Sequence, residues 1–273
     1  MSRLSKRFAE LKNQGRGGFI PFLTSYDPDP NTFKKILAGL PEAGADVIEI
    51  GVPFTDPAAD GPSIQAAGQR ALKAGATLEG TLEIIRDFRR TNNDTPIVLM
   101  GYFNPIYSMG CETFAKAAAE SGVDGLITVD LPPEEEEELR VPVQNAGIDI
   151  VRLIAPTTDD KRLPQVLKHA SGFIYYVSIA GITGTTSPTI DSIQLAAERL
   201  RKHTDLPLAV GFGIRTPELA SAVSRTADAA VVGSAVVERV AANLDDNGKA
   251  LPGLVNDVLH LVKNLADGVR INT

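Results

Sequence analysis

The chain has one cysteine, no tryptophan and only three histidines among its 273 residues. The single cysteine, Cys111, excludes an internal disulfide and is typical of a reducing compartment, so we expect a cytoplasmic protein. The histidines, His169, His203 and His260, all fall late in predicted helices. Because these positions lie away from the strand ends, we expect no metal site there.

Long apolar segments and an excess of positive charge are also missing. No apolar run approaches the roughly 20 residues needed to span a bilayer. Residues 1–14 place charged side chains among Leu4, Phe8 and Leu11, which predicts an amphipathic helix rather than a signal peptide. The net charge of −7 argues against a nucleic-acid partner. We therefore expect a soluble protein with no membrane and no nucleic-acid partner.

Short apolar runs alternate with amphipathic helical stretches along the whole chain. The eight runs are Gly18–Thr24, Asp46–Ile50, Pro96–Gly101, Gly125–Val129, Asp149–Ile154, Gly172–Val177, Pro207–Gly211 and Asp228–Val232. Strands that are apolar throughout and alternate with helices predict a parallel sheet covered on both faces. Eight such units favour an α/β fold of the (β/α)8 TIM-barrel type, with residues 1–273 as one domain. An open, doubly wound sheet remains possible, because periodicity does not reveal closure.

Helices are predicted between these runs and at both ends of the chain. Their expected ranges are 32–43, 64–73, 78–91, 112–120, 134–144, 160–170, 189–201, 217–224, 235–242 and 253–265. The helix in residues 1–14 is an extra N-terminal helix that we expect to cap the bottom of the barrel. The last range is an extra C-terminal helix. The acidic run of residues 134–138 is interpreted as a solvated helix start.

Acidic residues lie at or after the ends of three predicted strands. They are Asp27, Glu49, Asp56, Asp60 and Asp130. For Asp27, Asp56 and Asp130, each near a proline, bracing of a turn is the better interpretation. Glu49 differs because it lies inside an apolar strand, where an ionised side chain is costly without partners. We expect burial to raise its pKa, as a general acid/base at neutral pH requires.

Glycine-rich segments follow the last three predicted strands, at residues 181–184, 211–214 and 233–234. Each presents backbone N–H groups at a strand end, and the last one opens a helix. A helix N-terminus offers free donors and partial positive charge, and barrels often bind phosphate with the loops after strands seven and eight. Together the three segments predict a phosphorylated small-molecule ligand.

The residue types within the predicted strands limit the reactions that the barrel could catalyse. None of the eight contains a lysine, so a Schiff-base nucleophile has no candidate. Of Tyr175 and Tyr176, one should point into the barrel, where a hydroxyl could assist proton transfer, although packing is the commoner role. Arg152 could lie in the barrel interior or contact a ligand. Other strand ends carry apolar side chains that could line an aromatic pocket, although barrel core is the better interpretation for each singly: Phe22, Met100, Ile127, Val129 and Phe212.

The segment from Ile48 to Gln65, IEIGVPFTDPAADGPSIQ, resembles the signature of the tryptophan synthase alpha subunit family. The resemblance continues through residues 19–22, 102–105, 130–132, 155–157, 180–184, 211–214 and 233–235, and so covers essentially the whole chain. It implies a lyase of tryptophan biosynthesis that cleaves indole-3-glycerol phosphate to indole and glyceraldehyde 3-phosphate by a retro-aldol reaction.

The resemblance also implies roles for individual residues. Glu49 matches the general acid/base, Asp60 the carboxylate that stabilises charge at the indole N–H, and Tyr175 an active-site tyrosine. The remaining matches are phosphate contacts at Gly184, Gly213, Gly233 and Ser234, pocket positions at Phe22, Met100, Ile127, Thr183 and Phe212, and a subunit interface at Pro53, Asp56 and Asn104. The implied partner is a pyridoxal-phosphate-dependent beta subunit in an alpha2-beta2 heterotetramer, and no cofactor is expected in this chain.

Two positions depart from the family pattern, and three other functions compete. Tyr26 stands where many members have glycine, and Ile179 where some have arginine, which leaves loop closure and coupling open. Indole-glycerol-phosphate synthase is disfavoured by the absent strand lysines. A barrel that has lost catalysis is disfavoured by the intact Glu49 and Asp60. A lyase that releases free indole without a partner would use the same residues.

Overall fold

The strands form a closed parallel barrel. The computed structural model describes residues 2–177, 189–211 and 213–270. Within these ranges the strands are β1 Gly18–Thr24, β2 Ile48–Gly51, β3 Ile97–Gly101, β4 Gly125–Thr128, β5 Asp149–Ile150, β6 Arg152–Ile154, β7 Ile174–Val177, β8 Leu208–Gly211 and β9 Ala229–Val232. They pair in the order β5-β4-β3-β2-β1-β9-β8-β7-β6. Only Val151 separates β5 from β6, so the two form the single fifth strand of the prediction and close the sheet. The (β/α)8 barrel is confirmed, and the open sheet is excluded.

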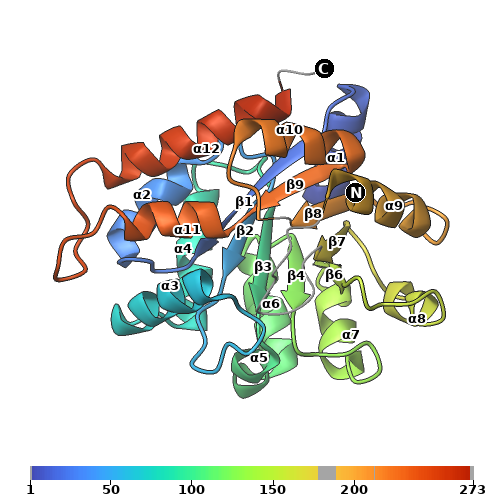
Figure 1. The fold of residues 1–273 in the computed structure, drawn as a ribbon. Helices are drawn as coiled ribbons and strands as arrows, with labels where there is room; N and C mark the ends of the chain where they lie inside the picture. The colour runs from blue at the N-terminus through green and yellow to red at the C-terminus, as the bar shows by residue number, and fades with distance from the viewer. Residues whose placement is uncertain (1, 178–188, 212, 271–273) are drawn as a thin grey trace.

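Helices surround the strands on the outside (Figure 1). They are α1 Arg3–Asn13, α2 Pro30–Gly39, α3 Pro62–Lys73, α4 Leu78–Arg89, α5 Phe103–Met109, α6 Cys111–Ser121, α7 Glu137–Asn145, α8 Leu163–Leu167, α9 Ile190–Leu200, α10 Pro217–Thr226, α11 Ser234–Ala241 and α12 Leu254–Arg270. Side-chain oxygens of Asp29, Thr77, Thr189 and Thr216 cap four of them. Among the described residues, no helix combines the length and apolar character that a membrane crossing needs.

The N-terminal helix α1 closes one end of the barrel, as the sequence predicts. Its Leu4, Phe8 and Leu11 are buried in one cluster with the inward side chains of the strands, including Val98 and Ala209. Arg3 anchors the helix through an Nη1 to Asp124 Oδ1 bond of 2.9 Å. With this end filled, ligand access is left to the opposite end, where the carboxyl ends of the strands lie.

Two side-chain predictions were wrong, and both concern the outer layer near α7. Arg152 points away from the barrel interior, because its neighbour Leu153 packs inside it and successive strand residues alternate. It forms an ion pair with Glu136, which is only 4% exposed and also lies 3.4 Å from Arg140. Arg152 is therefore not an interior residue of the barrel. The acidic run is not wholly solvated, and the helix starts after Glu136.

Candidate active site

Glu49 lies in the barrel interior on β2, between Phe22 of β1 and Val98 of β3 in the strand register. Its side chain is 1% exposed, and within the described residues Oε2 has no hydrogen-bond partner. Burial without a compensating donor raises the pKa of Glu49 to about 8, in the direction expected from the sequence. At neutral pH the carboxyl group is therefore mostly protonated and can act as a proton donor.

Tyr175 of β7 is the titratable neighbour of Glu49. Its side chain is half-buried, and burial together with the charge of Glu49 raises the pKa of Tyr175 well above its usual value. The hydroxyl occupies space above Gly211 of β8, where a Cβ atom would overlap it. Tyr176, the next residue, packs in the outer core instead. The structure therefore selects Tyr175 as the inward tyrosine.

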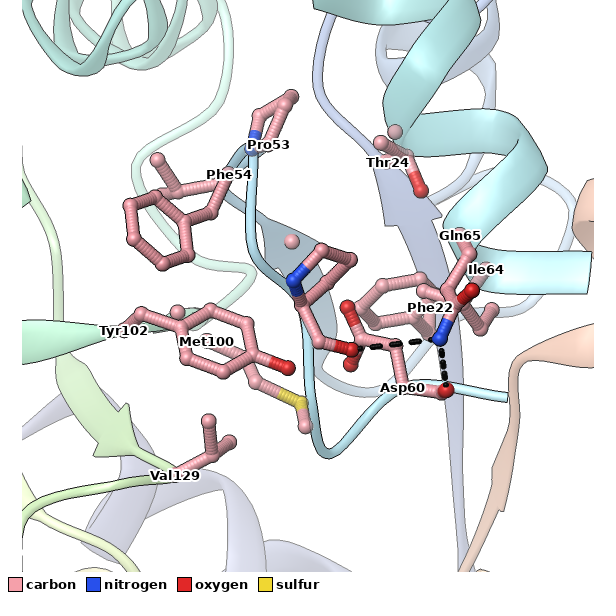
Figure 2. Close-up of a pocket in the computed structure, with 15 residues that line it drawn as sticks. Phe22, Thr24, Pro53, Phe54, Asp60, Ile64, Gln65, Met100, Tyr102 and Val129 are labelled. Carbon is pink, nitrogen blue, oxygen red and sulfur yellow. Dashed lines mark hydrogen bonds between the residues drawn. The ribbon is translucent and has the colours of Figure 1, made fainter. Parts of the chain in front are cut away.

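Asp60 lies on the loop after β2, just before Gly61 and Pro62 begin α3. Burial raises the pKa of Asp60 to about 6, against a hydrogen bond from the Tyr102 hydroxyl that lowers it. The Tyr102 oxygen accepts a 3.0 Å bond from the Ala59 amide. Gln65 Nε2 donates to the Asp60 carbonyl oxygen at 2.9 Å (Figure 2). These contacts from Tyr102, which directly follows β3, and from Gln65 of α3 hold the loop that carries Asp60 in place.

A pocket opens between this loop, the end of β3 and α3. Figure 2 shows Asp60 facing it, with the rings of Phe54 and Tyr102 stacked at a centroid distance of 5.1 Å. Phe22 and Met100, which the sequence predicts as pocket positions, line this pocket. The sequence did not predict five further lining residues, which are Thr24, Phe54, Ile64, Gln65 and Tyr102. Val129, which the sequence offered as a pocket position, also lines it. The lining is aromatic and aliphatic with one carboxyl group, which suits a flat apolar ring carrying a donor.

Other predicted positions lie near this pocket or outside it. Ile127 is fully buried in the barrel interior and is not a lining residue of the pocket. Pro53 lines the pocket rim, whereas Asp56 and Asn104 are exposed on the outer surface. Thr183, Gly184 and Phe212, like Ile179, lie outside the described residues.

The segment after β9 offers a helix N-terminus at the same end of the barrel. Gly233 precedes α11, no side chain caps this helix, and Ser234 is its first residue. Gly233 lies beside Phe22, since a Cβ built on it would be 3.6 Å from that side chain. Gly213, after β8, has a left-handed φ of +61°, which favours glycine. Uncapped amides beside the pocket can bind an anion such as phosphate.

Tyr26 stands in the first loop, where many members of the family have glycine. Its φ is +68°, in the left-handed region that glycine adopts most readily. Its hydroxyl packs against Gly80 of α4, where a Cβ atom would overlap it. The side chain therefore packs toward the outer helices, in the outer core.

In the part of the chain that the structure describes, no group of three or more His, Cys, Asp or Glu residues could hold a metal ion.

Two carboxyl groups with separated pKa values at the carboxyl ends of the strands place the protein in the class of (β/α)8-barrel enzymes that transfer protons. A family model described as "Tryptophan synthase alpha chain" matches residues 8–267. The chain belongs to the tryptophan synthase alpha chain family, and its predicted lyase function in tryptophan biosynthesis is confirmed.

Solved structures agree with this assignment. The chain is similar to tryptophan synthase subunit alpha from Legionella pneumophila, with 35% identity, 99% of each chain covered and a TM-score of 0.91. It is also similar to a chain from Aquifex aeolicus, with 37% identity, 98% and 99% coverage and a TM-score of 0.87. A chain of tryptophan synthase from M. tuberculosis matches at 29% identity, with 99% and 100% coverage and a TM-score of 0.87.

Proposed function

We propose that residues 1–273 form one catalytic domain in which Glu49 and Asp60 cleave indole-3-glycerol phosphate to indole and glyceraldehyde 3-phosphate. The observation that supports this most directly is the buried Glu49, whose pKa of about 8 keeps it protonated at neutral pH. Asp60, with a pKa of about 6, is mostly ionised at the same pH. Two carboxyl groups whose environments separate their pKa values can serve as acid and as anion together.

The reaction breaks the bond between indole C3 and the glycerol carbon attached to it. Protonated Glu49 gives its proton to C3, and Asp60 stabilises the positive charge that develops at the indole N–H. As the bond breaks, the electron pair returns to the indole ring and the hydroxyl on the departing carbon becomes an aldehyde. The resulting Glu49 carboxylate takes the hydroxyl proton, so no proton is consumed overall and Glu49 is ready for another cycle.

Neighbouring groups support this pair. Tyr175 lies close enough to Glu49 for the charge of Glu49 to raise the pKa of Tyr175, and its hydroxyl is proposed to assist the proton transfer. Phe22 and Met100 would contact the indole ring in the pocket. Gly213, Gly233 and Ser234, with Gly184, which follows β7 in the sequence, would bind the phosphate. Thr183, Phe212 and Ile127 are retained as proposed pocket positions, on the resemblance alone.

The same chemistry requires no cofactor in this chain, since the enamine character of indole supplies the electron sink. The proposed partner is a pyridoxal-phosphate-dependent beta subunit that receives the indole in an alpha2-beta2 heterotetramer in the cytoplasm. Pro53, Asp56 and Asn104 are its proposed contacts, and Asp56 and Asn104 are exposed as an interface requires.

A steady-state assay of indole release with and without the beta subunit tests this function. We expect slow release by the chain alone and a substantial increase when the beta subunit is added. Release by the chain alone at the same rate as the mixture would favour the lyase that acts without a partner. No release under either condition would refute the proposed reaction.

A further inference from the structure

A polar chain of three residues joins α3, the loop after β8 and α11. Glu238 Oε1 accepts bonds from Ser63 Oγ at 2.8 Å and from Arg215 Nη2 at 2.9 Å. Glu238 Oε2 accepts a second bond from Arg215 Nη1. The guanidinium is therefore held in a bidentate fork, and the carboxylate that holds it is fixed by a hydroxyl from another helix.

Arg215 and Glu238 are each close in the sequence to a residue that is proposed to bind the phosphate of the substrate. Arg215 follows Gly213 by two residues, and Glu238 lies one helical turn after Ser234 on α11. Side chains on a helix lean toward its N-terminus, so the Glu238 carboxylate lies over the turn that contains Ser234. The guanidinium bound to it is thereby held near the amides that open the helix.

Packing beneath this chain connects it to the substrate pocket. Val237, the neighbour of Glu238, is buried in one cluster with Phe22 and Ala67, and Met100 packs against that cluster. Ser63 lies three residues after Asp60, in the first turn of α3. A shift of α11 relative to α3 would therefore displace both Phe22 and Met100 in the pocket lining and the loop that carries Asp60.

Stability does not account for this arrangement. The side chains of Arg215 and Glu238 are 57% and 38% exposed, and an exposed ion pair contributes little to folding. An unneutralised Glu238 would, however, repel a phosphate bound one turn away. Arg215 offsets that charge, and its two bonds to Glu238 use only two of its five N–H donors.

We propose that Arg215 binds the phosphate of the substrate and that Glu238, held by Ser63, is the residue that positions it. This inference rests on the proposed function and adds a phosphate-specific residue to it. The planar guanidinium of Arg215 presents N–H donors in a geometry that suits phosphate oxygens. Because Glu238 already fixes the Arg215 side chain, little side-chain entropy is lost when the phosphate binds.

The test compares binding of indole-3-glycerol phosphate with binding of indole-3-glycerol by calorimetry, alongside steady-state kinetics. Arg215→Gln should weaken binding of the phosphorylated compound by at least about tenfold, since one hydrogen bond between charged groups is lost and Glu238 is left unneutralised. Its KM should rise similarly, with kcat within about twofold. Binding of indole-3-glycerol should be unchanged. Arg215→Lys should restore part of the loss, and Glu238→Gln should cost about threefold as a positioning residue.

Arg162 provides a matched control, since it forms a similar bidentate, exposed pair with Glu134 away from α11. Arg162→Gln should leave both affinities unchanged. Equal losses for the two compounds in Arg215→Gln, or a change below about twofold for the phosphorylated one, would overturn the inference. Binding does not require turnover, so wild-type chain that binds the phosphate but releases no indole would refute only the proposed function.

Discussion

The raised pKa of Glu49 can be changed by one buried side chain without touching the carboxyl group itself. Val98 is paired with Glu49 in the register of β2 and β3, faces the barrel interior and is fully buried. Val98→Thr nearly preserves the side-chain volume and adds a hydroxyl that can donate to the Glu49 carboxylate. A donor to the ionised form lowers a carboxyl pKa.

The size of the shift follows from hydrogen-bond energies. A bond to a charged group contributes about 1.5–3 kcal/mol, and about 1.4 kcal/mol corresponds to one pKa unit, so the pKa of Glu49 should fall by roughly one to two units from about 8. The proposed mechanism requires protonated Glu49 and ionised Asp60. The profile of kcat/KM for indole release should therefore rise through about 6 and fall through about 8 in the wild type.

In Val98→Thr the alkaline limb should move to about 7 or below, while the acidic limb stays near 6. Val231→Thr on β9 makes the same change at another buried interior position that is not paired with β2. It should leave both limbs in place. An alkaline limb that remains near 8 in Val98→Thr, or that moves equally in both variants, would refute the link between Glu49 and this limb.

Three further perturbations test neighbouring contacts. The pKa of Glu49 is higher in the folded protein than in the unfolded chain. Glu49 therefore does not reduce the free energy of unfolding below about pH 4.5, but reduces it increasingly as the pH rises toward about 8. Urea unfolding at pH 9 should therefore find Glu49→Gln more stable than wild type, by at most on the order of 5 kcal/mol, with the difference shrinking toward pH 5; no such trend would contradict the buried carboxyl. Tyr102→Phe removes the donor to Asp60, so the acidic limb of the rate profile should move above 6, and an unmoved limb would count against that bond. Gly211→Ala would place a Cβ against the Tyr175 hydroxyl and should cost about 1–3 kcal/mol in thermal or urea unfolding, whereas wild-type stability would show that the space is not filled.

The barrel could be predicted from the sequence because each strand is a short, continuously apolar run between helical segments. The same reasoning isolated Glu49, since an acidic residue inside such a run stands out. Strand boundaries were less certain, and the break at Val151 leaves no trace in the composition. The short helix α5 was not expected, since Pro105 falls within its seven residues and no side chain caps it.

Tertiary contacts could not be predicted in the same way. Glu136 looked like part of a solvated acidic run, but Arg152 comes from a strand and neutralises it. Tyr102 became part of the site through the fold of the loop after β2, which brings Asp60 to its hydroxyl. Tyr102 directly follows a predicted strand, and this position alone is enough to predict that an aromatic residue can belong to the site.

Turnover of Glu49→Gln on indole-3-glycerol phosphate shows whether the protonated carboxyl group of Glu49 supplies the proton for the cleavage. Glutamine keeps the size of the side chain but cannot donate and recover a proton. We expect indole release to fall by at least about a hundredfold, with substrate affinity within a few-fold of wild type. Near-normal turnover in this variant would show that Glu49 is not the proton donor.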